Sequence, residues 1–94
     1  MESEAAKQAS ETARSAVTQT RMSARHLASV LSRTAEALEQ SATLAEEHAL
    51  RREQAGRQEA AAHERRAASR AHQAAARARA QAEEWLKLIE ERET

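Results

Sequence analysis

Histidine, glutamate and serine are the residues of this sequence that could carry chemistry. A metal site on a helix requires ligands three or four residues apart, because that spacing places them on one face. No two histidines have this spacing, and none follows a glutamate by three residues, as in the di-iron sites of helical bundles. The sequence therefore predicts no metal site at His26, His48, His63 or His72.

Covalent catalysis is also disfavoured. A serine nucleophile needs an adjacent base that a third group orients, and a site that excludes water. The chain has no aspartate and no cysteine, and its single glycine cannot build a glycine-rich phosphate loop. Glu46/Glu47 and Glu83/Glu84 are neighbours in sequence, so on a helix they point in different directions. We expect no catalytic residue, no cofactor and no small-molecule substrate, and we predict that the protein is not an enzyme.

An arginine-rich segment is the best candidate for binding. Residues 51–79 hold eight arginines and three glutamates, a local charge of +5 with histidine neutral. On a helix, Arg66, Arg70 and Arg77 would share one stripe that could follow a phosphate backbone. The segment has no aromatic side chain to stack on a base and no recognisable DNA-binding module. The main interpretation is a solvated face with intrahelical Glu–Arg pairs, and binding of nucleic acid or of an acidic protein is the alternative.

Composition defines the elements that must position these residues. The chain of 94 residues contains 25 alanines, one glycine and no proline, which favours long helices. Apart from alanine and Met1, only twelve apolar residues are available for a core, so a monomer would bury little. We therefore expect self-association or a helical protein partner. Disorder of the isolated chain is the alternative at this low hydrophobicity.

Gly56, the only glycine, determines the predicted topology. Glycine favours the left-handed conformation that follows a helix end, and Arg51 and Arg52 suit the negative end of the preceding helix dipole. We predict an all-α, antiparallel helical hairpin that resembles a coiled coil. Its parts are a frayed N-terminal helical extension at 1–16, a first helix at 17–55, a turn at 56–57 and a second helix at 58–92.

Three further details belong to this prediction. Ser3 is a candidate N-cap for the first helix, followed by Glu4 in the first turn. One uninterrupted helix is an alternative, because a lone glycine costs a helix only about 1 kcal/mol. A further break near residues 41–43 is another, since Thr43 and Glu46 match a capping box.

Folding at Gly56 would place a leucine stripe of the first helix against an alanine seam of the second. Positions 17, 24, 31, 38 and 45 read Val, Ala, Leu, Leu and Ala, and positions 61, 68, 75 and 82 are all Ala. Leu27 would lie opposite Trp85, and large residues would face small ones along the seam. The predicted interface residues are Val17, Leu27, Leu31, Leu38, Ala68, Ala75, Ala82, Trp85, Leu88 and Ile89.

The first helix would extend past the mouth of the hairpin, where it lacks an intramolecular partner. Two hairpins packed into a dimeric four-helix bundle would cover it, as would a helical partner protein. We therefore expect an interaction module that acts as a scaffold, adaptor or regulator. No segment approaches the roughly 20 apolar residues of a membrane span, and the N-terminus has no signal-peptide pattern, so we expect a cytoplasmic location.

Overall fold

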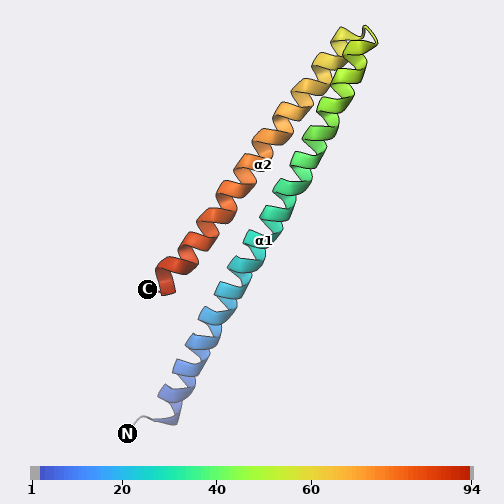
Figure 1. Ribbon diagram of the computed structural model, residues 1–94. Helices are drawn as coiled ribbons and strands as arrows, with labels where there is room; N and C mark the ends of the chain where they lie inside the picture. Colours follow the sequence, from blue (N-terminus) through green and yellow to red (C-terminus); the bar gives the residue numbers. More distant parts are fainter. Residues whose placement is uncertain (1–2, 94) are drawn as a thin grey trace.

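The computed structural model describes residues 3–93, which form one antiparallel hairpin of two helices (Figure 1). Helix α1 spans Glu4–Gln54 and helix α2 spans Gln58–Glu93. The molecule is 82 Å long and 18 by 13 Å across. The predicted all-α hairpin is confirmed. Neither alternative is found in the described residues: the helices separate at the glycine, and α1 continues through residues 41–43, where the Thr43 hydroxyl donates to the Glu39 carbonyl.

Ser3 caps the N-terminus of α1, as predicted. Its backbone is extended, with φ −71° and ψ 155°, and its hydroxyl oxygen accepts a hydrogen bond from the Ala6 N–H at 3.2 Å. Glu4 lies in the first turn, where a carboxylate suits the positive end of the helix dipole. This arrangement satisfies one of the free N–H groups that begin every helix.

The turn between the helices is a Schellman motif centred on Gly56. The glycine has φ +80°, and its N–H donates to the Glu53 carbonyl at 3.0 Å. The Arg57 N–H donates to the Arg52 carbonyl at 2.8 Å. These two hydrogen bonds are the pair that defines a Schellman motif at the C-terminus of a helix. The Ala61 N–H then donates to the Arg57 carbonyl, so α2 begins directly after the turn.

Alanine from both helices forms the centre of their contact. The buried residues of α1 are Ala24, Ala28, Ala35, Ala42 and Ala49, and those of α2 are Ala61, Ala68, Ala75, Ala78, Ala82 and Ile89. Most recur every seven residues, the period that keeps one face of a helix against its partner. We call these buried alanines the alanine seam. A methyl group is the largest side chain along most of the seam, so the two backbones can pack closely.

The leucines of the predicted stripe do pack against alanines, but at the edge of this contact rather than at its centre. Leu31 and Leu38 lie at the edge of the seam, half-buried against its alanines. Leu27 and Trp85, which we expected to face each other in the core, are 42% and 38% exposed. The reason is rotational: the α1 row that begins at Ala28 is turned toward α2, which leaves the neighbouring leucine row at the side of the contact.

Helix α1 extends well past the end of α2. At 1.5 Å per residue, the 51 residues of α1 span about 76 Å and the 36 residues of α2 about 54 Å. The N-terminal part of α1 consequently has no α2 beside it (Figure 1), and every residue from 3 to 20 is exposed. We call residues 4–20 the overhang. The helix is unbroken where we predicted an extension at 1–16, of which residues 1–2 lie outside the described residues; its fraying stays a prediction.

Candidate interaction surface

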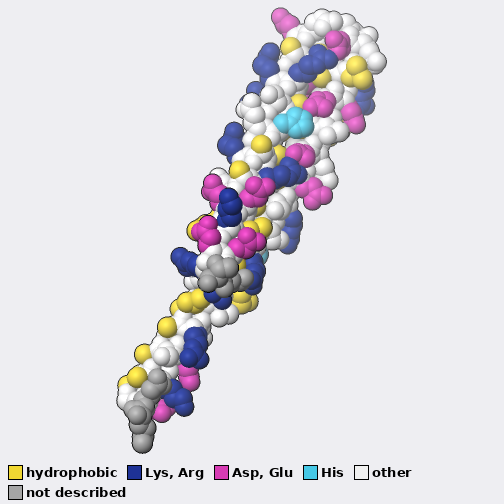
Figure 2. All heavy atoms as spheres, turned by 60° about the vertical axis from the view of Figure 1, so that its left-hand side comes forward, with side chains coloured by type: hydrophobic (Ala, Val, Ile, Leu, Met, Phe, Trp, Pro, Cys, Tyr) yellow, Lys and Arg dark blue, Asp and Glu magenta, His cyan; other side chains and the backbone are white. Residues whose placement is uncertain are grey.

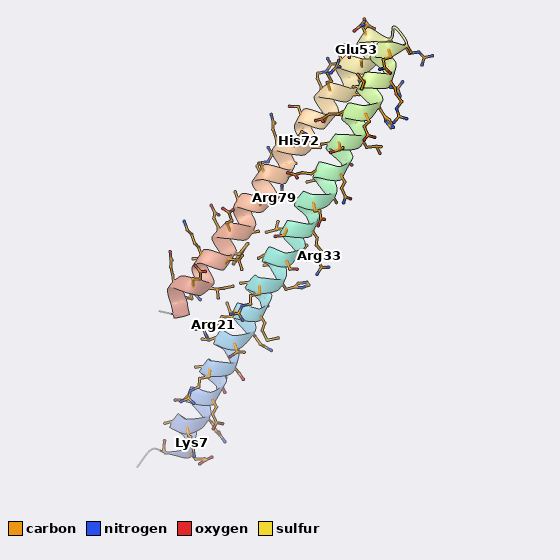
Figure 3. All side chains as sticks on the ribbon, in the orientation of Figure 1. Lys7, Arg21, Arg33, Glu53, His72 and Arg79 are labelled. Atoms are coloured by element: carbon orange, nitrogen blue, oxygen red, sulfur yellow. The ribbon has the colours of Figure 1, made fainter. Side chains whose placement is uncertain are left out.

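One side of the hairpin carries ion pairs between the two helices. Glutamates of α1 form ion pairs with arginines of α2 at Glu53–Arg65 and Glu39–Arg79, and between these two pairs Glu46 is hydrogen-bonded to His72. On each helix the partners are seven residues apart, so the pairs form a single row along the line where the helices meet (Figure 3). We call this side the charged flank. The sequence analysis expected pairs within one helix, whereas these pairs join the two.

These pairs are solvent-exposed, which limits their energy. The Glu46–His72 contact measures 2.8 Å, with both side chains about half exposed. Exposed ion pairs contribute about 0.2–1 kcal/mol each. Arg52 and Glu64 form a looser pair near the turn, at 3.6 Å, but on the other side of the contact, because Arg52 continues the α1 row of Leu31 and Leu38. The charged flank therefore aligns the two helices more than it stabilises them.

The opposite side of the hairpin has no charged side chain along most of its length. Three neighbouring rows of α1 face this way, and from residue 9 to residue 48 they contain only Ala, Ser, Thr, Val, Leu and His48. The rows are positions 9, 16, 23, 30, 37 and 44; positions 10, 17, 24, 31, 38 and 45; and positions 13, 20, 27, 34, 41 and 48. On α2, the row next to the seam on this side reads Glu64, Ala71, Ala78, Trp85 and Arg92, so its charges lie only toward the two ends, and the row beyond it reads Ala60, Ala67, Ala74, Gln81 and Leu88. We call this side the uncharged flank.

Several large apolar side chains of the uncharged flank are open to solvent. Leu27 and Val30 are each 42% exposed, Leu44 is 52% exposed and Leu88 is 47% exposed. The same rows continue into the overhang through Val17, and Figure 2 shows hydrophobic side chains along one edge of the overhang and charged ones along the other. The flank is thus one uncharged strip about 60 Å long, from residue 9 to residue 48 at 1.5 Å each, in which apolar side chains are interspersed with Ser and Thr.

A small apolar hollow lies at the mouth of the hairpin. It encloses about 80 Å3 and is lined by Thr20, Arg21, Ala24, Trp85, Leu88, Ile89 and Arg92. Thr20, Ala24 and Leu88 belong to the rows of the uncharged flank or border them, so the hollow continues that surface. The Nε of Arg21 is buried there without a hydrogen-bond partner in the described residues. Such a donor carries a desolvation cost until an acceptor or water reaches it.

The predicted polyanion-binding residues lie on the outer side of α2. Arg66, Arg70 and Arg77 are exposed, and the described part of the chain offers none of them an ion pair. Arg65 and Arg79, by contrast, are engaged on the charged flank. The arginine-rich segment is thus divided between an inner row that binds α1 and an outer set that remains available.

The predicted interface residues divide into three groups. Ala68, Ala75, Ala82 and Ile89 are buried in the helix contact, and Leu31 and Leu38 are half-buried beside it. Val17, Leu27, Trp85 and Leu88 are exposed. Val17 belongs to the overhang, and the other three lie on or beside the uncharged flank. The sequence analysis missed this flank as a surface, although the absence of charge from three adjacent rows is readable in the sequence.

Residues 3–93 contain no group of three histidine or glutamate side chains arranged to hold a metal ion. None of the helices in this range is long and apolar enough to span a bilayer.

Comparison of the chain with protein-family models, with curated proteins and with solved structures gives no significant match.

Proposed function

We propose that the protein is a non-enzymatic helical interaction module that acts by self-association through its uncharged flank. The observation that supports this proposal is the contrast between the two sides of the hairpin. The charged flank finds its partners within the chain, whereas the uncharged flank leaves Leu27, Val30 and Leu44 in solvent. Large apolar side chains exposed together on one side of a small protein are typical of an interaction site.

The size of the flank suits a second copy of the chain. A strip about 60 Å long and one helix diameter wide, about 10–12 Å, offers roughly 600–700 Å2 per copy. Stable dimers bury about 800 Å2 per partner, and two long hairpins packed side by side form a four-helix bundle. A scaffold, adaptor or regulator role would follow from this assembly. A helical partner protein is the other occupant that would fit the same flank.

Leu44 and Leu50 provide a matched test of this surface. They are the same residue type on the same helix, 52% and 54% exposed, but only Leu44 belongs to the uncharged flank. Sedimentation equilibrium should show that Leu44→Glu raises the dimer Kd by about 100-fold or more, because two carboxylates per dimer would lose hydration. Leu50→Glu should leave the Kd unchanged.

The parent protein sets the standard for this comparison. Its helicity and melting temperature should rise with concentration if folding and association are linked. A folded species at the monomer mass of 10.4 kDa, with a melt independent of concentration, would contradict self-association. An unfolded monomer at every concentration would instead point to a helical partner of different sequence.

Nucleic-acid binding remains the second candidate, and it has one observation of its own in favour. Arg66, Arg70 and Arg77 are exposed and lack ion pairs among the described residues. If each contacts a phosphate of duplex DNA, the logarithm of the binding constant should fall against the logarithm of salt with a slope of about −2.7. Alanine at all three positions should abolish that binding, and binding that ignores salt would exclude this candidate.

A further inference from the structure

We propose that two copies pack antiparallel through their uncharged flanks in one defined register. This register places Glu84 of each copy beside Arg77 of the other, and Leu44 of each copy at the mouth hollow of the other. The inference rests on the proposed self-association and adds its direction and alignment. Two independent features of the chain point to the same arrangement.

The first feature is a row of charges at the border of the uncharged flank on α2. This row reads His63, Arg70, Arg77, Glu84 and Glu91, so it is basic toward the turn and acidic toward the C-terminus. A parallel copy would set like charges against like. An antiparallel copy sets Glu84 against Arg77 and Glu91 against Arg70 at once. Both contacts form in one register because Glu84 and Glu91 are seven residues apart, as are Arg70 and Arg77. Two-fold symmetry then forms each contact twice.

The intramolecular contacts leave these arginines available for such a partner. Arg70 and Arg77 have no ion pair within the described part of the chain, and both are exposed. They lie beside the alanine row of Ala67 and Ala74, so their side chains can reach a second α2 packed on that row. The pairs would sit at the rim of the interface, where charges direct alignment more than they add affinity.

The second feature is a projection and a hollow on the same flank. Leu44 projects into solvent at one end, and the hollow of about 80 Å3 opens at the other, beside Trp85 and Leu88. In a contact between two identical surfaces, a side chain that projects from one copy must meet a hollow on the other copy. An antiparallel pair of copies satisfies this condition twice, because it brings each Leu44 toward the opposite mouth.

Both features give the same alignment. Pairing Glu84 with Arg77 puts the two-fold axis next to Gln81. Ala35 packs with Ala75 and Ala78 across the hairpin, so the axis passes beside residues 30–32 of α1. Rotation about that axis carries Leu44 to within about one helical turn, 5.4 Å, of Thr20, which lines the hollow. The register deduced from charges thus also brings Leu44 to the edge of the mouth hollow.

Single cysteines test this register cleanly, because the chain has no cysteine of its own. Gln81→Cys lies next to the axis and should form a disulfide between copies under mild oxidation. Ala74→Cys occupies the same row one heptad away. Its Cα atoms would be about 20 Å apart across the dimer, at 1.5 Å per residue, whereas a disulfide needs less than about 7 Å. It should therefore remain uncrosslinked.

Any other outcome of this crosslinking experiment overturns the proposal. Crosslinking of both variants would indicate parallel copies, and crosslinking of Ala74→Cys alone would indicate a different register. If neither variant crosslinks while sedimentation gives a dimer, the copies meet through another surface. A monomeric parent would instead refute the self-association itself, so the two failures are distinguishable.

A charge exchange gives a second, independent readout on the dimer. Arg77→Glu would set two glutamates against each other at each site, and it should raise the Kd roughly 3- to 30-fold. Adding Glu84→Arg restores opposite charges between copies, so the double variant should return to within about 2-fold of the parent. A double variant that associates more weakly than Arg77→Glu would contradict the register.

Discussion

The two flanks of the hairpin share the same heptad spacing, but one carries charged residues that pair within the chain and the other carries uncharged residues. On the charged flank, Glu39, Glu46 and Glu53 meet basic residues of α2, and the surface is complete within one chain. On the uncharged flank, the same seven-residue spacing repeats Ala, Thr, Ser and Leu, and the described residues leave Leu27, Val30 and Leu44 of its outer rows exposed. The hairpin is therefore asymmetric: one side joins its own two helices, and the other is the side through which we propose that a second copy binds.

The alanine seam is the element on which both flanks depend, and overpacking it should have the largest effect on stability. Ala75 is fully buried, whereas its neighbour Ala76 is exposed. Ala75→Leu should lower the free energy of unfolding by about 1–3 kcal/mol, because the helices must move apart to admit the larger side chain. Ala76→Leu should be nearly neutral. Chemical unfolding at one fixed protein concentration measures both, and equal effects would mean that the seam is loosely packed.

The turn determines which rows face each other, so it affects both flanks together. Gly56 has φ +80°, and a Cβ added there would meet no atom within 4 Å. Gly56→Ala should therefore cost about 1–2 kcal/mol through backbone conformation alone. Gly56→Asn should cost less, since asparagine adopts the left-handed conformation more readily. Thermal melts of the two variants test this order, and a neutral alanine would place the end of α1 elsewhere.

The charged flank should show the smallest effect. Glu39→Gln removes the ion pair with Arg79 and should cost about 0.2–1 kcal/mol at low salt, with less cost as screening increases. Glu36→Gln is the control, because Glu36 is exposed and no ion pair joins it to the described residues. A loss above about 2 kcal/mol for Glu39→Gln would show that this flank carries the stability that we assign to the seam.

Much of the fold follows from local signals in the sequence. The hairpin, its turn at Gly56 and the Ser3 cap were all predicted, because each depends on a residue with a strong local preference. The α1 side of the helix contact was not. From their hydrophobicity, Leu27 and Trp85 were expected in the core. The rows of Ala28 and Ala75 occupy it instead, because alanine allows the two backbones to approach more closely. Which row turns inward depends on packing across two helices, which no single helix reveals.

The candidate surface was only partly predictable for the same reason. Leu27 and Leu88 were named as interface residues, but as part of the contact between the helices. Their exposure became visible once the alanine seam had taken the central position. The pairing of Glu46 with His72 likewise joins residues far apart in sequence, and it depends on the turn and on the rotation of both helices.

Trp85 reports directly on whether a second copy covers the uncharged flank. It is the only tryptophan, it is 38% exposed in the single hairpin, and it lines the mouth hollow. Its fluorescence should be blue-shifted and protected from acrylamide in concentrated protein, and it should shift to the red on dilution through the same range in which sedimentation shows dissociation. A dimer whose Trp85 emission and quenching match those of the dilute monomer would contradict the account, because the copies would then associate without covering this flank.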